Sequence, residues 1–287
     1  MRLQRGAALI LVLMVTGILG LLLLQIGLTA KSYVAQANAL QERAEASLRL
    51  HSRESAMIFT LLTNPWVKDP EARNDSPYLA LLNFRGDPFE VDGARFRIQD
   101  ESGLIPVPQP GQAVEEWAAL LQEFGWAAPQ VARFAEQFRA LQEPKGGDKS
   151  AWAPIQSFGE LRDLDGMSAA ALQRLEQCST LYPVLVFNPL TAPPEVLAVK
   201  YRGVSRDAVL DLRARGELSL KSLYDLTGQG VDEFTAGYPG PALRLDIAVK
   251  VGSVALRRET RVVIEPYADL PLRVWESHPR NGAEGWQ

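Results

Sequence analysis

A long apolar run opens the chain. Residues 7–30 contain no charge, and these 24 positions exceed the roughly 20 that a membrane-spanning helix needs. They also exceed the apolar region of an ordinary secretory signal. Arg2 and Arg5 precede the run and Lys31 follows it, so the larger positive charge lies on the N-terminal side. This asymmetry predicts a cytoplasmic N-terminus, with everything after Lys31 on the far side of the membrane.

The helical pattern continues beyond this run. Residues 32–62 contain neither glycine nor proline, and apolar residues recur there at helix-compatible intervals. The recurring residues are Ala35, Ala39, Ala46, Leu50, Ile58 and Leu61. Because Asn64 and Pro65 end the pattern, one long helix is predicted. Its first half would lie in lipid, and its second half would pack an apolar stripe on a soluble domain.

Alternating apolar and polar residues predict strands in the soluble part. A short strand covers residues 96–99 and ends in an Asp-Glu-Ser-Gly turn. Near the C-terminus, residues 243–251 alternate strictly, Gly252 and the following serine supply a turn, and a second strand covers 254–264. An irregularity is expected at 257–258.

The stretch between the two strand regions looks helical and contains a weak internal repeat. Each copy has an apolar helix, a glycine turn and a second helix, and the turns are centred on Gly125, Gly166 and Gly203. Ser168 and Ser205 follow two of these glycines, at the place where the second helix needs an N-cap. A fourth copy, LKSLYDLTGQGVDEF, is fainter.

Such a hairpin also resembles the helix-hairpin-helix, whose turn amides bind DNA phosphates. This resemblance gives an alternative function, a membrane-anchored periplasmic DNA-binding protein of the competence type. In the copy around Gly203, however, nearby carboxylates offset the basic residues. The basic residues are Arg202, Arg206, Arg213 and Arg215, and the acidic ones are Asp207, Asp211 and Glu217. Because phosphate binding needs an excess of cations, a packed helical hairpin is favoured and no nucleic acid partner is expected.

Composition narrows the function classes further. The chain has 287 residues and a net charge of -4, so it has no overall basic field to attract nucleic acid or anionic lipid. Its single cysteine, Cys178, cannot form an intrachain disulfide. His51 lies in the predicted long helix and His278 lies near the C-terminus, so neither is placed for a catalytic triad or a metal cluster. We therefore predict a non-enzymatic protein with no catalytic, cofactor-binding or metal-binding residues.

The first residues resemble a class 3, type IV prepilin-like signal. In that family a short basic leader ends in glycine and the apolar helix starts at once, which here places the cut between Gly6 and Ala7. The resemblance implies that a prepilin peptidase removes the leader, that Ala7 becomes the N-methylated mature terminus, and that the helix is retained. Two alternatives are a plain anchor that keeps Met1 and an ordinary secretory signal that is cut after Ala37.

The fifth mature position separates the branches of this family. Most pilins and pseudopilins carry glutamate there, whereas this chain has Leu11. Minor pseudopilin K of type II secretion systems, the general secretion pathway protein K family, typically lacks this glutamate, and the chain resembles that family in this respect. Since a carboxylate within the membrane is costly without a partner, its loss suits a subunit with no neighbour above it.

Motifs in the soluble part extend this resemblance to nearly the whole chain. The segments QDESGLIPVP, FGELRDLDGM and LYPVLVFNPLTAPPEVL, followed by the final strands, occur in the order of the family's motifs. The best-matching residues are Asn188, Thr191, Ala192, Glu195, Val196 and Leu197. Pro106 and Pro108 stand where the family has asparagines, and its D-W-R-D segment is missing between Phe138 and Trp152. The chain resembles a divergent member.

The resemblance implies an α+β pseudopilin fold, with a long N-terminal transmembrane helix, a small antiparallel β-sheet and a large inserted all-α domain of helical hairpins. The expected parts are a cleaved leader (1–6), a transmembrane helix (7–30), its periplasmic continuation (31–64), a first β part (65–105), the inserted helical domain (106–238), a second β part (239–274) and a flexible tail (275–287).

The same resemblance implies a location, a role and partners. The chain would be a single-pass inner-membrane protein with a periplasmic C-terminal domain, later placed at the pseudopilus tip to support protein export across the outer membrane. Its partners would be minor pseudopilins I and J, the major pseudopilin and the prepilin peptidase. No cofactor is expected; some relatives bind calcium, but no ligands are assigned here. A periplasmic scaffold or adaptor is a further alternative.

Overall fold

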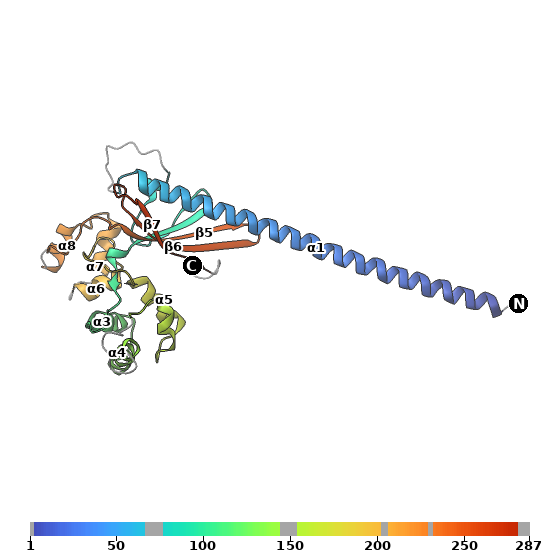
Figure 1. Cartoon of the computed structure of the whole chain (residues 1–287), viewed down its shortest axis with the longest axis horizontal. Helices are drawn as coiled ribbons and strands as arrows, with labels where there is room; N and C mark the ends of the chain where they lie inside the picture. The colour runs from blue at the N-terminus through green and yellow to red at the C-terminus, as the bar shows by residue number, and fades with distance from the viewer. Residues whose placement is uncertain (1–2, 67–76, 144–153, 202–205, 229–231, 281–287) are drawn as a thin grey trace.

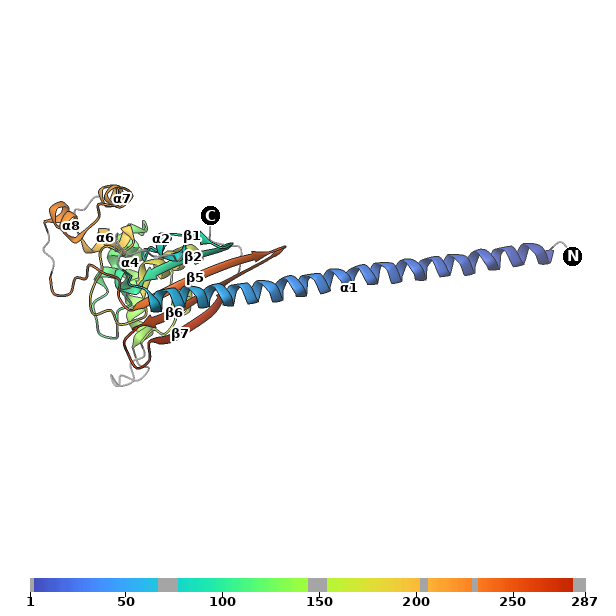
Figure 2. The same cartoon turned by 90° about the horizontal axis from the view of Figure 1, so that it is seen from above.

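The chain folds into a long helix and a head. The computed structural model describes residues 3–66, 77–143, 154–201, 206–228 and 232–280. We call the described residues from Glu42 onward the head. Helix α1 (Leu3–Thr63) projects far beyond the head (Figure 1, Figure 2). In the head, α1 runs along a sheet, and helices α3, α4 and α5 lie beyond that sheet from α1 (Figure 1).

Helix α1 is a single helix of 61 residues, which confirms the prediction of one long helix. The Asn64 amide still donates to the Thr60 carbonyl at 3.2 Å. The next residue, Pro65, has no amide hydrogen with which to continue the pattern, so the helix ends where the sequence indicates.

The apolar stripe of α1 packs on the sheet over only part of its predicted length. Ala46, Leu50 and Leu61 are buried there, as expected, and Met57 joins them. The side chains of residues 12–40 are exposed, and these include two alanines of the predicted stripe. The packed part of the helix therefore begins later than the periodicity indicates, since small alanines continue the pattern without contacting the sheet.

The main sheet is antiparallel and has the strand order β1-β2-β5-β6-β7. Its strands are β1 (Phe89–Val91), β2 (Ala94–Asp100), β5 (Ala242–Val251), β6 (Val254–Ile264) and β7 (Leu272–Arg280). In the pair β2 and β5, Phe96 lies opposite Ile247. Because these two strands are neighbours, the residues between them form an insertion that leaves the sheet and returns to it.

The predicted strand pair near the C-terminus is confirmed, but the predicted irregularity at 257–258 is wrong. The register between β5 and β6 is unbroken, and Gly252 takes a positive φ of 55° in the connecting turn. The irregularity lies instead between Arg261 and Val262, where β6 meets β7. Glu276 pairs with the first of these residues and Val274 with the second, so Trp275 is the extra residue of a β-bulge.

Strand β7 corrects the expected C-terminal tail. Residues 275–280 belong to this strand, so the flexible tail predicted for 275–287 begins too early, and 281–287 lie outside the described residues. Most of β7 is exposed at the edge of the sheet, so it lacks the alternation that marks the other strands. An edge position also tolerates Pro279, which has no amide hydrogen to donate to a neighbouring strand.

Short helices make up most of the insertion. They are α3 (Glu115–Glu123), α4 (Ala128–Gln142), α5 (Ala169–Cys178), α6 (Pro194–Lys200), α7 (Arg206–Ala214) and α8 (Leu220–Thr227). The remaining short elements are α2 (Pro77–Leu81) before the sheet, the 3-10 helices η1 (Glu101–Gly103) and η3 (Phe158–Asp163), and the parallel pair β3 (Ile105–Pro106) and β4 (Ser179–Thr180).

The helical repeat is confirmed in part. Gly125 and Gly166 have positive φ values of 90° and 84°, as a helix-ending glycine requires. Ser168 caps α5 by accepting a hydrogen bond from the Ala171 amide at 3.1 Å. The helix before Gly166 is the 3-10 helix η3 rather than an α-helix. The turn around Gly203, including the predicted capping serine, lies outside the described residues.

Two separate hydrophobic cores result. The helix-sheet core contains residues of α1, α2, β1, β2, β5 and β6, with Phe96 fully buried in it. The helical core contains residues of the insertion and centres on Trp117, whose ring lies 5.1 Å from that of Phe138 and 6.2 Å from that of Phe134, centroid to centroid. None of the described residues belongs to both cores, so other contacts must hold the two parts of the head together.

Candidate functional site

The part of α1 outside the head presents an apolar surface, residues 12–30, that no other described residue covers. It is long and apolar enough to cross a membrane. The hydroxyls of its two threonines form hydrogen bonds with the helix backbone. Thr16 donates to the Val12 carbonyl at 2.8 Å, and Thr29 donates to the Gln25 carbonyl at 2.9 Å. A helix that satisfies its own hydrogen bonds in this way is suited to lipid or to packing against other apolar helices.

The predicted processing residues lie at the beginning of α1. Gly6, Ala7 and Leu11 are all within this helix, so the backbone continues from the leader into the apolar run. Cleavage between Gly6 and Ala7, methylation of Ala7 and the meaning of Leu11 depend on other proteins and stay predictions.

Two glutamates of α1 attach the helix to the sheet. Buried Glu54 accepts hydrogen bonds from Arg258 Nη1 at 2.7 Å and from the Thr260 hydroxyl. Glu42 lies nearer the N-terminus and accepts from both the amide and the hydroxyl of Ser253, at 3.0 and 2.8 Å. These hydrogen bonds lower the pKa of Glu42. The tip of the β5-β6 hairpin is thus bound to α1 where the helix leaves the head.

A buried aspartate, Asp100, joins both ends of the insertion. One carboxylate oxygen accepts from the amides of Ser102 and Gly240, at 2.9 and 3.2 Å. The other accepts from the Ser102 hydroxyl at 2.6 Å, from Asn188 Nδ2 at 3.0 Å and from the Thr191 hydroxyl at 2.9 Å. Five donors therefore satisfy one carboxylate that is completely shielded from solvent, and hydrogen bonds to an ionised group are stronger than neutral ones.

This arrangement brings the predicted motif residues together. Asn188 and Thr191 contact Asp100 directly, and Ala192, Val196 and Leu197 are buried in the helical core. The chain also passes close to Thr191 at Gly103, where an added Cβ atom would lie 2.7 Å from Thr191 Oγ1. Glu195, the remaining motif residue, forms an ion pair with Arg206 at 3.2 Å. The segment around Asp100 and the segment around Asn188 and Thr191 thus form a single polar junction between the sheet and the inserted domain.

A second link, absent from the sequence prediction, connects Arg244 of β5 with the insertion. Its Nε and Nη2 atoms donate to the two carboxylate oxygens of Glu101 at 3.0 and 3.2 Å. Nη1 donates to the Glu176 carbonyl at 2.6 Å, and Nη2 also donates to the Ser179 carbonyl at 3.0 Å. Burial opposes the charge of Arg244, but the carboxylates of Glu101 and Glu259 outweigh this effect and raise its pKa. The only sequence signal was a charged residue at an alternating strand position.

The residues considered for chemistry are not assembled into a reactive site. His51 is exposed on α1, and His278 lies on β7 beside Glu276. Burial raises the pKa of the Cys178 thiol to about 12, which keeps it protonated and unreactive. Within the described part of the chain, no three His, Cys, Asp or Glu side chains gather to hold a metal ion. Calcium ligands are therefore not assigned, and the expectation of no cofactor stays a prediction.

Comparisons with known proteins rest on structure alone. No family model and no curated protein matches the chain. A solved structure does match: GspK in the GspK-GspI-GspJ complex of the type 2 secretion system from enterotoxigenic Escherichia coli. The TM-score is 0.55 at 16% sequence identity, and the match covers 86% of this chain and 100% of the other. This chain has a GspK-like fold.

The match confirms the predicted fold class, a mixed helix and sheet protein with a long apolar N-terminal helix. It covers 86% of this chain, and the part left uncovered is shorter than the insertion between β2 and β5, so most of the inserted helical domain belongs to the shared fold. At this level of identity the similarity establishes architecture, and the roles of individual residues follow from their contacts.

Proposed function

We propose that the chain is a non-enzymatic minor pseudopilin of the K type, located at the tip of a type II secretion pseudopilus and supporting protein export across the outer membrane. The observation that carries this proposal is the GspK-like fold, which matches the full length of its neighbour and 86% of this chain. The long apolar helix α1 is a separate observation that agrees with it.

In this proposal α1 has two successive environments. It first anchors the protein in the inner membrane, with the N-terminus in the cytoplasm and the head in the periplasm, because positive residues precede the span. After the prepilin peptidase cuts between Gly6 and Ala7, the same helix becomes part of the fibre stem. Its uninterrupted apolar surface suits contact with lipid and contact with neighbouring pseudopilin helices.

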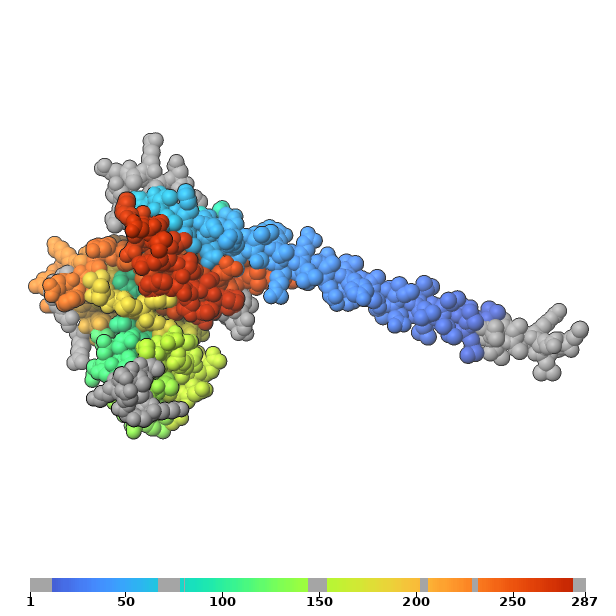
Figure 3. Space-filling view, viewed as in Figure 1, coloured from blue at the N-terminus to red at the C-terminus, as the bar shows by residue number. Residues whose placement is uncertain are grey.

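The bulk of the head supports a position at the tip. The inserted helices broaden the end of the molecule that lies away from the N-terminus (Figure 3). A subunit stacked above this end in a helical fibre would collide with them, whereas a tip subunit has no such neighbour. Leu11 agrees with this placement, because an apolar residue there needs no partner from a subunit above. Minor pseudopilins I and J, and below them the major pseudopilin, are the proposed contacts.

The first experiment tests processing. The full chain is co-expressed with a prepilin peptidase, and the mature N-terminus is measured by mass spectrometry. We expect N-methylated Ala7, and we expect Gly6→Val to block the cut while the protein stays in the membrane fraction. The control is Gly20→Val, since a Cβ atom at Gly20 meets nothing within 4 Å.

Other N-termini would contradict the proposal in distinct ways. Retention of Met1 in the unmodified chain would indicate a plain anchor, and a terminus at Asn38 would indicate an ordinary exported protein. Normal processing of Gly6→Val would also refute the assigned cleavage site. Co-purification with minor pseudopilins I and J then tests assembly, and failure to form that complex would remove the tip assignment even if processing is as expected.

A further inference from the structure

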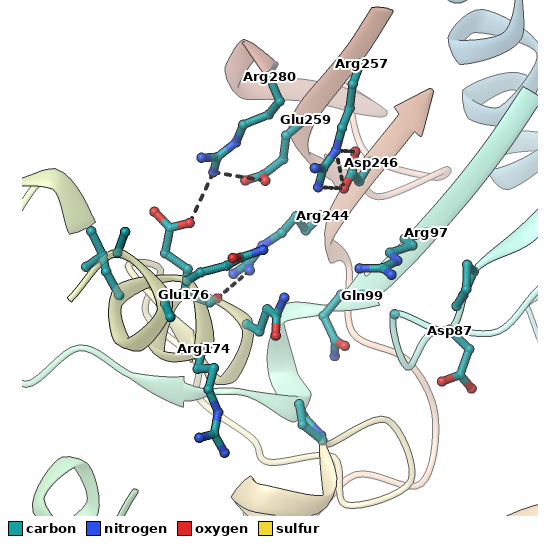
Figure 4. A pocket seen from close by; sticks show the side chains of 18 of the residues that line it. Asp87, Arg97, Gln99, Arg174, Glu176, Arg244, Asp246, Arg257, Glu259 and Arg280 are labelled. Carbon is teal, nitrogen blue, oxygen red and sulfur yellow. Dashed lines mark hydrogen bonds and ion pairs between the residues drawn. The ribbon is translucent and has the colours of Figure 1, made fainter. Parts of the chain in front are cut away.

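A groove of about 1420 Å³ lies on the face of the sheet that α1 does not cover. Polar side chains from β2, β5 and β6 form its floor, and α5 and the loop at 85–88 lie on opposite sides of them (Figure 4). Along β2 and β5, the polar residues that line the groove alternate with Phe96, Ile98 and Leu245, which are buried in the helix-sheet core. Since successive side chains of a strand point to opposite faces, the groove belongs to the second face of the sheet.

The inserted domain holds the groove open. Arg244 Nη1 donates to the Glu176 carbonyl of α5 at 2.6 Å, and Arg280 Nη2 lies 3.4 Å from the Glu176 carboxylate. Both contacts lie along one side of the groove, as Figure 4 shows. They fix α5 at a distance from the rest of the sheet and leave the surface between them accessible.

The groove is rich in arginine. Seven of its lining residues are arginines and four are carboxylates. The arginines are Arg85, Arg97, Arg162, Arg174, Arg244, Arg257 and Arg280, and the carboxylates are Asp87, Glu176, Asp246 and Glu259. The whole chain carries a net charge of -4, so this concentration of positive charge contrasts with the rest of the molecule. A local surplus of this kind attracts anionic groups.

Ion pairs on the floor of the groove neutralise only part of this charge. Arg257 Nε contacts both oxygens of Asp246, at 2.8 and 3.1 Å, and Arg280 contacts Glu259 at 3.1 Å. At the edges of the floor, Arg85 pairs with Asp87 at 3.0 Å, and Arg244 pairs with Glu101 at 3.0 Å. Burial is the largest influence on Arg97 and lowers its pKa. Asp246 opposes this effect, whereas the positive charge of Arg257 adds to it. Arg97 lies opposite Asp246 in the register of β2 and β5, on the same face of the sheet as these ion pairs.

The mouth of the groove presents two further arginines to solvent. Arg162, at the end of η3, is exposed, and Arg174 on α5 is exposed and stacks over the Phe124 ring at 4.2 Å. The stacking restricts the side chain of Arg174 without neutralising its charge. A partner can thus meet positive charge at the mouth first and then reach Arg97 inside.

We propose that this groove binds a carboxylate-rich segment of a partner protein. Guanidinium groups pair with carboxylates through two parallel hydrogen bonds, which favours such a ligand. The resident carboxylates at Asp87 and Glu176 lie among the arginines and would repel a densely charged polyanion such as a nucleic acid. A peptide whose acidic residues are spaced apart can place its carboxylates beside the arginines and its uncharged residues beside Asp87 and Glu176. The site needs only the folded head, so it does not depend on the proposed role in secretion.

The test uses the full chain in non-ionic detergent and a labelled peptide in which glutamate alternates with serine. Binding is followed by fluorescence anisotropy, with a matched peptide carrying glutamine in place of glutamate. We expect the glutamate peptide to bind, the glutamine peptide to bind far more weakly, and added salt to weaken binding. The double variant Arg97→Gln, Arg162→Gln should weaken binding by about tenfold, since two charge contacts are lost.

The matched control is Arg273→Gln, which removes an exposed arginine that pairs with Glu265 and does not line the groove. It should leave peptide affinity unchanged. The single variant Arg162→Gln, at an exposed position, keeps the test valid if the double variant folds poorly. Equal binding of the two peptides, equal weakening by Arg273→Gln, or unchanged affinity in Arg162→Gln would overturn the proposal. Tighter binding of a DNA oligonucleotide or inorganic phosphate than of the peptide would overturn the choice of a carboxylate ligand.

Discussion

The helix-sheet core and the helical core differ in what holds their elements in place. In the first, β5 and β6 are joined by an unbroken hydrogen-bonded ladder, and the ladder presents one apolar face to α1. In the second, helices such as α3, with 9 residues, are too short to be stable alone and depend on aromatic packing around Trp117. The inserted domain therefore owes its stability to tertiary contacts, including the links through Asp100 and Arg244, to a greater degree than the sheet does.

The largest expected effect comes from emptying the helical core. Trp117→Ala removes a fully buried ring that stacks on Phe134 of α4 and Phe158 of η3 and should destabilise the inserted domain by about 3–5 kcal/mol. Hydrogen exchange measured by mass spectrometry should show lost protection in α3 and α4 while β5 and β6 stay protected. Equal loss of protection in the strands would contradict the separation of the two cores. Leu141→Ala, at an exposed position of α4, is the control.

A smaller effect, but one that reaches both cores, is expected at Asp100. Asp100→Asn replaces an oxygen that accepts three hydrogen bonds with an amide that donates, so it should cost about 2–3 kcal/mol. Protection should fall at the end of β2 and in the segment around Thr191 together. Asp163→Asn, at an exposed position, provides the comparison and should change little. A loss confined to the helices would show that the junction does not couple the two halves.

The smallest effect concerns the pH dependence of stability. Burial raises the pKa of Glu259, but Arg244, Arg280 and Arg261 together bring it below its ordinary value of 4.5. The folded state thus binds this proton less tightly than the unfolded chain does. Glu259 stabilises the fold above 4.5, and that contribution disappears as the pH falls through the pKa of the folded state.

Denaturant titrations at a series of pH values check this dependence. The free energy of unfolding of Glu259→Gln should fall less steeply than that of the unmodified chain on acidification below 4.5. Identical slopes would show that the arginine cluster does not control the charge of Glu259. Glu123→Gln, at an exposed position on α3, should reproduce the slope of the unmodified chain.

Periodicity was sufficient to predict the elements that carry apolar side chains on one face only. Helix α1 and strands β2, β5 and β6 show regular apolar spacing because a single face of each contributes to the helix-sheet core. Strand β7 has no such pattern, since it lies at the sheet edge and most of its residues are exposed. Before Gly166, a run that resembles a helix forms only the 3-10 helix η3, because local spacing does not distinguish the two.

The polar links were predictable only where a family resemblance supplied them. Asn188 and Thr191 were found in that way, although their common partner Asp100 lies about 90 positions earlier in the chain. Nothing in the sequence pairs Arg244 with Glu101, since 143 positions separate them and each looks like an ordinary surface charge. The groove arginines were missed for the same reason, because they come from several strands, two helices and a loop.

The attachment at Glu42 sets how far the head stands from the membrane in the proposed orientation. The apolar run ends at Ala30, and the twelve helical steps from there to Glu42 span about 18 Å at 1.5 Å per residue. This distance is more than twice the Debye length of about 8 Å at physiological ionic strength. Salt therefore screens the acidic head from the charge of the lipid headgroups, and the head can tilt or rotate without an electrostatic preference imposed by the membrane surface.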